Sequence, residues 1–325
     1  MEYWKDALSK HIFSEASQSD IQMILKEKRA HIPTRLFKYR EFNENNLESL
    51  RNSTTWCAAA ATFNDPYDSS ITLFWSPQDL NDLFIKGLFL TPQYGLPEPD
   101  PEMVKRVKQA SDPETEYIKI LCERDSSQNF EQSTKAMKWA KGLVMEQFKK
   151  GVQLVNQILK HEYQISCFCQ NLNSMPMWYH YADKYRGFVI EYNFVDSDKY
   201  DSILSNLWPV IYSEKLFDMT PFLKPVFDNK PKNELLPIFA CISKSIDWAY
   251  EKEWRLIIEN KSSDKGMLYP IPKANAVYIG KDTSAKNREK LLKIATSIDI
   301  AAYEMDLSTS IFEMVPRPLK SIKKI

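Results

Sequence analysis

One stretch of the chain, residues 248–258, alternates charged residues with aromatic and aliphatic ones and reads WAYEKEWRLII. A strand here would place Trp254 on a core face, because successive side chains point to opposite sides. Glu251, Glu253 and Arg255 would then share the other face. On an exposed surface such a ladder contributes under ~1 kcal/mol per pair, whereas in a cleft the guanidinium would hold and tune the carboxylates. We favour the cleft, because the flanking aromatic residues can wall it off.

A second group of candidates lies in the run FNDPYD at residues 63–68. Asn64 and Asp65 can cap their own turn through side-chain bonds to backbone amides, and Pro66 fixes a φ angle. The turn is therefore expected to be rigid and to hold Asp65 and Asp68 in defined positions. A purely structural turn explains Asn64 and Pro66, but it explains the second carboxylate less well, so Asp68 stays a candidate for chemistry.

Two cations stand close together in the segment LFKYR at residues 36–40. On a strand, Phe37 and Tyr39 share one face while Lys38 and Arg40 share the other. Two cations on one face indicate either an edge strand that is wet on that side or an anion bound against them. Both interpretations stay open.

The run MWYHYAD at residues 177–183 places a histidine among aromatic residues. As a short helix it would put His180 and Tyr181 on one face with Trp178 beside them. Such a histidine is more often a satisfied core residue, and the alternative is a site that uses its imidazole. Gly187 follows closely and is one of only 7 glycines in the chain, so backbone freedom or a close approach is expected there.

Four soft ligand types lie within twenty residues, namely His161, Cys167, Cys169 and His180. They are enough in number for zinc, but their spacing matches no usual structural zinc site, so ordinary buried cysteines are the simpler interpretation. A nucleophilic pair of either cysteine with His180 is a further alternative. No metal is predicted.

Composition narrows the classes of function. The chain has 325 residues, and its 43 basic side chains are offset by 43 acidic ones. Zero net charge argues against a protein that coats nucleic acid or anionic lipid. With 7 glycines there is no G-x-G-x-x-G and no Walker loop to cradle phosphate. The sequence has no apolar segment of bilayer length and no signal peptide, and its number of cysteines is odd. These features predict a soluble cytoplasmic protein without a membrane partner.

Helices and strands in irregular order predict an α+β fold with a mixed, largely antiparallel central sheet, flanking helices and a helical insertion. The predicted domains are N-terminal helices at 1–34, a single catalytic-type domain at 35–310 with the insertion at about 77–160, and a basic tail at 311–325. An apolar stripe in the insertion is interpreted as core. Strands are predicted at 35–39, 54–59, 163–168, 187–194, 210–212, 253–258, 276–279 and 300–304, and helices at 43–51, 133–159, 232–245 and 284–297.

Six motifs, in this order, resemble the bacterial family known as domain of unknown function 2971. They span about residues 35–285, and the chain departs from the family pattern at Cys169, where the family often has Ser, and in its long helical insertion. The resemblance implies a bacterial effector with a phage-defence or toxin-like role. The motifs are FKYR at 37–40, FNDPYD at 63–68, SCFC at 166–169, MWYHYADKYRG at 177–187, WAYEKEWR at 248–255 and VYIG at 277–280.

The order of polar residues in these motifs is similar to the Arg–Ser–Glu plan of ADP-ribosyltransferases, which split NAD at the nicotinamide bond. That similarity implies that Arg40 holds a phosphate or ribose of NAD, and that Ser166, or alternatively Ser53, supports the nicotinamide pocket. Glu253 would stabilise the ribosyl oxocarbenium ion, because positive charge develops in the transition state. Glu251 would orient the acceptor, a protein or a nucleic acid.

We expect the candidate residues to gather in one cleft that acts on a nucleotide. One alternative is a hydrolase or nuclease with a divalent ion held by Asp65, Asp68 and Glu253. Another is a non-catalytic module that binds a nucleotide or a protein. The predicted catalytic residues are Glu253, Glu251, His180 and Asp68, and the predicted ligand-binding residues are Arg40, Tyr39, Asn64, Asp65, Ser166, Trp178, Tyr181 and Arg255.

Overall fold

The computed structural model describes residues 4–5, 18–76, 79–80, 100–195, 201–222, 234–261 and 265–319. The chain divides into two compact units. The first contains Met1–Ser70, Gln157–Phe217 and Asn233–Ile325, and the second contains Ile71–Asn156 and Asp218–Lys232. All of the candidate site residues named above lie in the first unit, and the insertion expected at about 77–160 falls largely in the second.

The first unit is built on a ten-stranded sheet. Its β12–β13 pair is parallel, and the other pairs described in this sheet are antiparallel. The predicted α+β fold with a mixed, largely antiparallel sheet is therefore confirmed. The sheet runs through β11 (Gly266–Pro270), β2 (Thr54–Ala59), β4 (Tyr163–Cys169), β1 (Leu36–Arg40), β5 (Phe188–Tyr192), β12 (Ala276–Ile279), β13 (Ala301–Leu307) and β14 (Met314–Pro318), with β10 (Glu253–Glu259) beside β4 and β6 (Leu207–Pro209) beside β10.

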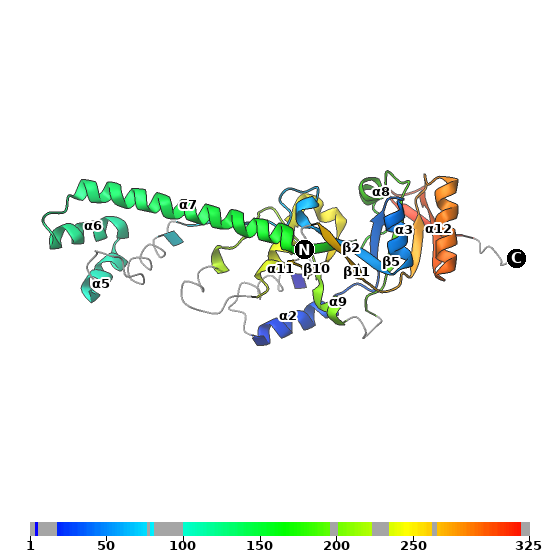
Figure 1. Cartoon of the computed structure of the whole chain (residues 1–325), viewed down its shortest axis with the longest axis horizontal. Helices are drawn as coiled ribbons and strands as arrows, with labels where there is room; N and C mark the ends of the chain where they lie inside the picture. The colour runs from blue at the N-terminus through cyan, green and yellow to red at the C-terminus, as the bar shows by residue number, and fades with distance from the viewer. Residues whose placement is uncertain are drawn as a thin grey trace. The chain divides into compact units, whose positions relative to one another are not determined.

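Apolar layers cover both faces of this sheet. Leu36 joins the layer that includes α3 (Glu44–Arg51) and α12 (Ala285–Ser297). Its neighbour Phe37 joins the layer that includes α8 (Met175–Tyr181), as the two-residue period of a strand requires. Figure 1 shows α3 and α12 lying beside the sheet of this unit, near β5. Strand β1 is therefore covered on both faces and paired on both edges.

Shorter elements complete the first unit. Helix α3 begins after Asn43, whose Oδ1 accepts a hydrogen bond from the Asn46 N–H at 2.8 Å and so caps the helix. Strand β7 pairs with β9 in parallel. The remaining elements are α2 (Gln18–Ala30), η1 (Ala60–Thr62), α9 (Asp201–Asn206), β7 (Ile211–Ser213), α11 (Leu236–Ile242), β9 (Ser243–Ser245) and η3 (Ile246–Glu251).

The second unit is mainly helical. It contains α5 (Pro101–Gln109), α6 (Pro113–Arg124) and most of α7 (Phe130–Glu162). Strand β3 (Ile71–Thr72) stands at its start and pairs with β8 (Phe217–Asp218). Along α7 Leu159 is the buried residue, whereas Val144 is 49% exposed. The interpretation of the whole apolar stripe as core is therefore wrong over the described residues of this helix.

Two sequence predictions differ from the structure, one at the end of a helix and one in the C-terminal tail. The helix expected at 232–245 is observed as α11, because β9 begins directly after Ile242. The expected tail at 311–325 has a core element after all, since β14 pairs with β13 and Met314 is buried. The first half of the N-terminal helices expected at 1–34 lies largely outside the described residues. None of the described helices is long and apolar enough to cross a membrane.

Candidate functional site

The first unit contains a buried cluster of charged side chains centred on Arg255, which is fully buried. The Arg255 guanidinium binds the Asp68 carboxylate with two hydrogen bonds, Nη1–Oδ1 at 2.7 Å and Nη2–Oδ2 at 2.6 Å. Its Nε also donates to Glu253 Oε1 at 3.0 Å, and Nη1 donates to the Cys241 carbonyl at 2.5 Å. Buried charges need this pairing, because an isolated ion loses its hydration without compensation.

Lys244 extends this buried cluster toward helix α8. Its ammonium donates to a carboxylate oxygen of Glu251 and, at 3.0 Å, to Glu253 Oε2. The second oxygen of Glu251 accepts a hydrogen bond from the Tyr181 hydroxyl at 2.6 Å. A continuous line of contacts that begins at Asp68 therefore ends at Tyr181.

The local backbone explains how these side chains reach one another. Glu253 and Arg255 leave β10 on the face opposite Trp254, as predicted, and that face is buried. Glu251 does not lie on the strand, so its predicted place in the ladder is wrong. It ends the short helix η3, and Lys252 then turns the chain with a left-handed φ of 45°. The Glu251 carboxylate reaches the cluster from this turn.

The cluster has three carboxylates for two cations, and this imbalance separates the pKa values of its two glutamates. Burial alone would raise the pKa of Glu253, but the nearby Arg255 and Lys244 cations outweigh burial and lower it to about 2. Burial, together with the charge of Glu253, raises the pKa of Glu251. Glu251 is therefore the glutamate that takes up a proton more readily, and it is the one that touches Tyr181.

Strand β4 has three neighbours in the sheet although a strand has only two edges. Strand β10 pairs along its whole length, from Tyr163 to Cys169. Strands β2 and β1 must therefore share the other edge, where β2 pairs at Gln164 and Ile165 and β1 pairs at Cys169. Between these points, residues 166–168 have no strand partner on that edge within the described sheet. The ladder of hydrogen bonds consequently has a gap between β1 and β2.

Side chains close the base of this gap. The Lys38 ammonium donates to Ser166 Oγ at 2.5 Å and to the Cys167 carbonyl at 2.9 Å. Ser166 Oγ in turn lies 2.8 Å from Thr55 Oγ1. Ser166 is therefore a buried partner of Lys38 and does not reach an open surface.

A pocket of about 670 Å³ takes residues from both strands that flank the gap. Tyr39 and Arg40 come from β1, Trp56 comes from β2, and Tyr181 comes from α8. This Arg40 pocket therefore meets the buried cluster at Tyr181. Its remaining lining residues, mostly polar and mostly from α3 and its flanks, are Glu41, Asn43, Asn45, Asn46, Glu48, Ser49, Asn52, Thr54 and Leu268.

Neither cation of β1 forms an ion pair with a carboxylate among the described residues, although the charge of Glu253 acts on Lys38 and that of Glu41 acts on Arg40. Arg40 is half-buried, and its guanidinium makes no hydrogen bond or ion pair to any described residue; burial lowers its pKa. Burial, and then the charge of Arg40, lowers the pKa of Lys38 to about 7. The interpretation of β1 as a wet edge strand is wrong, because it pairs with β4 and β5. An anion in the pocket would offset both charges.

The FNDPYD turn contributes to the cluster and contacts Tyr181, which lines the pocket. Asp68 pairs with Arg255, and the side chain of Asn64 is hydrogen-bonded to Tyr181. Asp65 Oδ1 accepts the Tyr67 N–H at 2.9 Å, which closes the expected turn. Its Oδ2 is buried and has no hydrogen-bond partner in the described structure. The turn and the strand that carries Arg255 therefore meet, but they meet in a buried cluster and not in an open cleft.

Two other predicted site residues lie away from the pocket. His180 is exposed and contacts only the rings of Tyr179 and Tyr181 among its aromatic neighbours. Trp178 is fully buried, and its indole N–H donates to the Leu172 carbonyl at 2.7 Å. Helical periodicity sends these two neighbours to different sides of α8, one to solvent and one to the core.

The structure does not assemble the alternative metal or thiol sites. Among the described residues, no group of three or more His, Cys, Asp or Glu side chains is placed to hold a metal ion. The Asp68 carboxylate is already engaged by Arg255. Burial raises the pKa of Cys167 well above its ordinary value, so this thiol lacks the thiolate character of a nucleophile.

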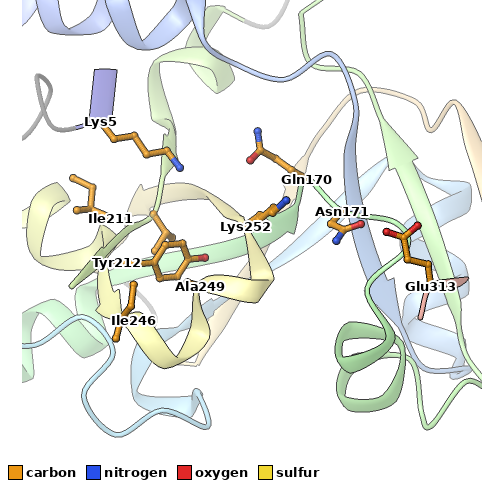
Figure 2. A pocket seen from close by; sticks show the side chains of 10 residues that line it. Lys5, Gln170, Asn171, Ile211, Tyr212, Ile246, Ala249, Lys252 and Glu313 are labelled. Carbon is orange, nitrogen blue, oxygen red and sulfur yellow. The ribbon is translucent and has the colours of Figure 1, made fainter. Parts of the chain in front are cut away.

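A second pocket, of about 780 Å³, lies at the end of β4 (Figure 2). Lys5, Gln170, Tyr212 and Lys252 are among its lining residues, and their side chains come from separate segments of the chain. The Tyr212 hydroxyl accepts a hydrogen bond from the Glu253 backbone N–H at 2.9 Å. This pocket therefore touches the backbone beside the cluster, whereas the Arg40 pocket touches the cluster through Tyr181.

Comparison with known proteins bears on the segment that carries most of the cluster. Residues 177–256 match the family described as "Protein of unknown function (DUF2971)". The resemblance inferred from the motifs is confirmed. The matched segment includes Tyr181, Glu251, Glu253 and Arg255, and Asp68 and Arg40 lie outside it. No curated protein matches the chain, and no solved structure does.

Within and around the DUF2971 segment, sequence reasoning missed two important residues. Lys244 joins Glu251 to Glu253, but it sits on a three-residue strand that carries no periodic signal. Trp56 is the one exposed residue of β2 and stands between the buried residues Thr55 and Cys57. The alternation in TTWCAA is a signal that points to this tryptophan.

Proposed function

We propose that the chain binds a phosphate-bearing small molecule, a nucleotide, in the Arg40 pocket. The observation that carries this proposal is the half-buried Arg40 guanidinium, which lines the pocket and has no hydrogen-bond partner among the described residues. A guanidinium donates in a fork that matches phosphate oxygens. The asparagines of α3 add neutral donors and acceptors for a ribose or a base.

In the same proposal, Tyr181 and Glu251 move a proton to or from the bound ligand. Tyr181 lines the pocket and donates to Glu251, whose pKa is raised. A raised pKa makes a carboxyl a better proton acceptor than an ordinary glutamate. Arg255 and Lys244 are positioning residues, because they hold the carboxylates without facing the pocket.

NAD is the nucleotide that the similarity to ADP-ribosyltransferases singles out, so NAD cleavage is the finer form of the proposal. An arginine on an early strand that lines a pocket supports this form. Glu253 is buried and bound to two cations, so here it acts by fixing Glu251 rather than by touching the ribose. A protein or a nucleic acid would be the acceptor, in keeping with an effector in phage defence.

Binding is tested by calorimetric titration of the whole chain with NAD, ATP and pyrophosphate. Arg40→Ala should weaken every phosphate ligand roughly 10- to 150-fold, the equivalent of about 1.5–3 kcal/mol for a hydrogen bond to a charged group. Arg51→Ala, which removes an exposed arginine outside the pocket, is the matched control and should bind as the wild type does. Absence of binding to the wild type, or equal binding by Arg40→Ala, would refute the proposal.

Chemistry is tested separately by following nicotinamide release from NAD. Tyr181→Phe keeps the ring but removes the hydroxyl that contacts Glu251, so turnover should fall by about 10²–10⁴ while NAD binding persists. If the wild type binds NAD without cleaving it, the proton-transfer step is wrong and the pocket belongs to a non-catalytic binding module.

A further inference from the structure

We infer that Trp56 is the stacking platform for the base of the nucleotide in the Arg40 pocket, an inference that rests on the proposed function. The side chain is 45% exposed although it stands on β2 between two neighbours, Thr55 and Cys57, that are at most 1% exposed. A tryptophan gains most from burial of its large apolar surface. Trp56 leaves much of that surface open inside a pocket.

The other side of the indole is supported by backbone. Strand β11 pairs with β2 and places Gly266 beside the ring. A Cβ built on Gly266 would lie 2.6 Å from Trp56 Cζ2 and 2.8 Å from Trp56 Cε2, so the ring packs directly against the glycine. Gly266 has a φ of +134°, which side chains rarely adopt. The platform is therefore held in place before any ligand binds.

The neighbours of Trp56 match the other parts of a nucleotide. Arg40 in the same pocket supplies the phosphate contact, and the asparagines of α3 supply neutral hydrogen bonds. No ring contact to Trp56 is found among the described aromatic residues, so its exposed face has no aromatic partner within that part of the chain, and the residue opposite it on β11 is the aliphatic Leu268. A planar heteroaromatic base fits this face, because every base stacks through its π-surface.

The test compares ligands that have a base with ligands that lack one. The whole chain, the Trp56→Ala variant and the Trp56→Phe variant are titrated with ATP, NAD, ribose 5-phosphate and pyrophosphate. Trp56→Ala should raise the Kd for ATP and NAD roughly 5- to 150-fold, which corresponds to the ~1–3 kcal/mol of one base–aromatic stack. It should leave the Kd for pyrophosphate and ribose 5-phosphate unchanged, and Trp56→Phe should retain most of the affinity for nucleotides.

Trp139→Ala is the control for the loss of an exposed indole, because Trp139 is 69% exposed and lies outside the pocket. This variant should bind the nucleotides with the same Kd as the wild type. Unchanged nucleotide binding in Trp56→Ala, with pyrophosphate still lost in Arg40→Ala, overturns this inference and leaves the proposed function standing. Equal loss of nucleotides and pyrophosphate in Trp56→Ala also overturns it, because a stacking contact acts on the base alone. If the wild type binds none of these ligands, the proposed function itself fails.

Discussion

Removal of the Asp68 carboxylate should destabilise the first unit by about 3–5 kcal/mol, the usual effect of breaking a buried ion pair from one side. Asp68→Ala deletes the hydrogen bonds at 2.7 and 2.6 Å to a guanidinium that is fully buried. Each charge-assisted hydrogen bond is worth about 1.5–3 kcal/mol, so the two losses give a figure of the same size. Arg255 would keep Glu253 as its remaining carboxylate contact in the cluster.

The same substitution separates two explanations of the cluster's stability. Without Asp68 the formal charges balance, with Glu251 and Glu253 opposite Lys244 and Arg255. If net charge governed stability, Asp68→Ala would be neutral or stabilising. If directed pairing governs it, the variant loses stability despite the balance. Asp68→Asn keeps the shape and removes the charge, so its loss should be smaller.

The measurement is urea unfolding at pH 7, followed by tryptophan fluorescence and by circular dichroism, with unfolding of the two units fitted separately. Glu131→Gln is the matched control, because it breaks a surface ion pair in which Glu131 is 77% exposed and Lys135 is 74% exposed. Its urea midpoint should equal that of the wild type. Asp68→Ala combined with Arg255→Met removes the guanidinium that would otherwise lack its bidentate partner, while Glu253 keeps Lys244, so the double variant should lose less stability than the sum of the two single variants. A midpoint for Asp68→Ala equal to that of the control would refute the reasoning.

Three further predictions follow from single contacts. Gly187→Ala should lower the thermal midpoint strongly, because a Cβ at this position would lie 2.2 Å from the Arg40 carbonyl oxygen. Gly151→Ala is the control, because nothing lies within 4 Å of its Cβ, and it should stabilise its helix by about 0.5–1 kcal/mol. A thermal midpoint of Gly187→Ala equal to that of the wild type would contradict the close approach. Burial lowers the pKa of Lys38 from its ordinary value of 10.5 to about 7. Between these two pH values Lys38 is neutral in the folded chain and charged in the unfolded chain, so the free energy of unfolding should rise with pH by up to about 1.4 kcal/mol per pH unit. Urea titrations from pH 7.5 to 9.5 should show a smaller slope in Lys38→Met than in the wild type, and equal slopes would rule the effect out. The cations around Glu253 lower its pKa from 4.5 to about 2, so its ionised form stabilises the fold above pH 4.5 and this stabilisation is lost as the pH falls toward 2. In an acid titration the free energy of unfolding of Glu253→Gln should therefore decline less than that of the wild type.

Much of the local structure could be predicted because it depends on neighbouring residues. Strand β2 and strand β12 begin and end where the alternation and the turn residues indicate. The opposite faces of Trp254 and Arg255 followed from the strand period alone. The turn at Asp65 followed from the tendency of Asp and Pro to fix a turn.

The candidate site could be predicted only in part, because its geometry depends on which strands pair. The gap beside β4 arises from three partners competing for two edges, and no local pattern around Ser166 indicates it. The departure of Glu251 from the strand depends on the left-handed turn at Lys252, a residue type that rarely adopts this backbone. Lys244 joins the cluster through tertiary packing and carries no sequence signal of its own.

The contacts that build the cluster also determine when it can form during folding. Asp68 and Arg255 are 187 positions apart, and Lys38 and Ser166 are 128 apart. Contacts between such distant residues form slowly, because chain entropy is lost before they stabilise anything. On the ribosome, Asp68 must wait for β10 to be made, which takes about ten seconds or more at roughly 5–20 residues per second. The cluster should therefore form late, only after β10 has been synthesised, and the proposed ligand site that depends on it should form no earlier.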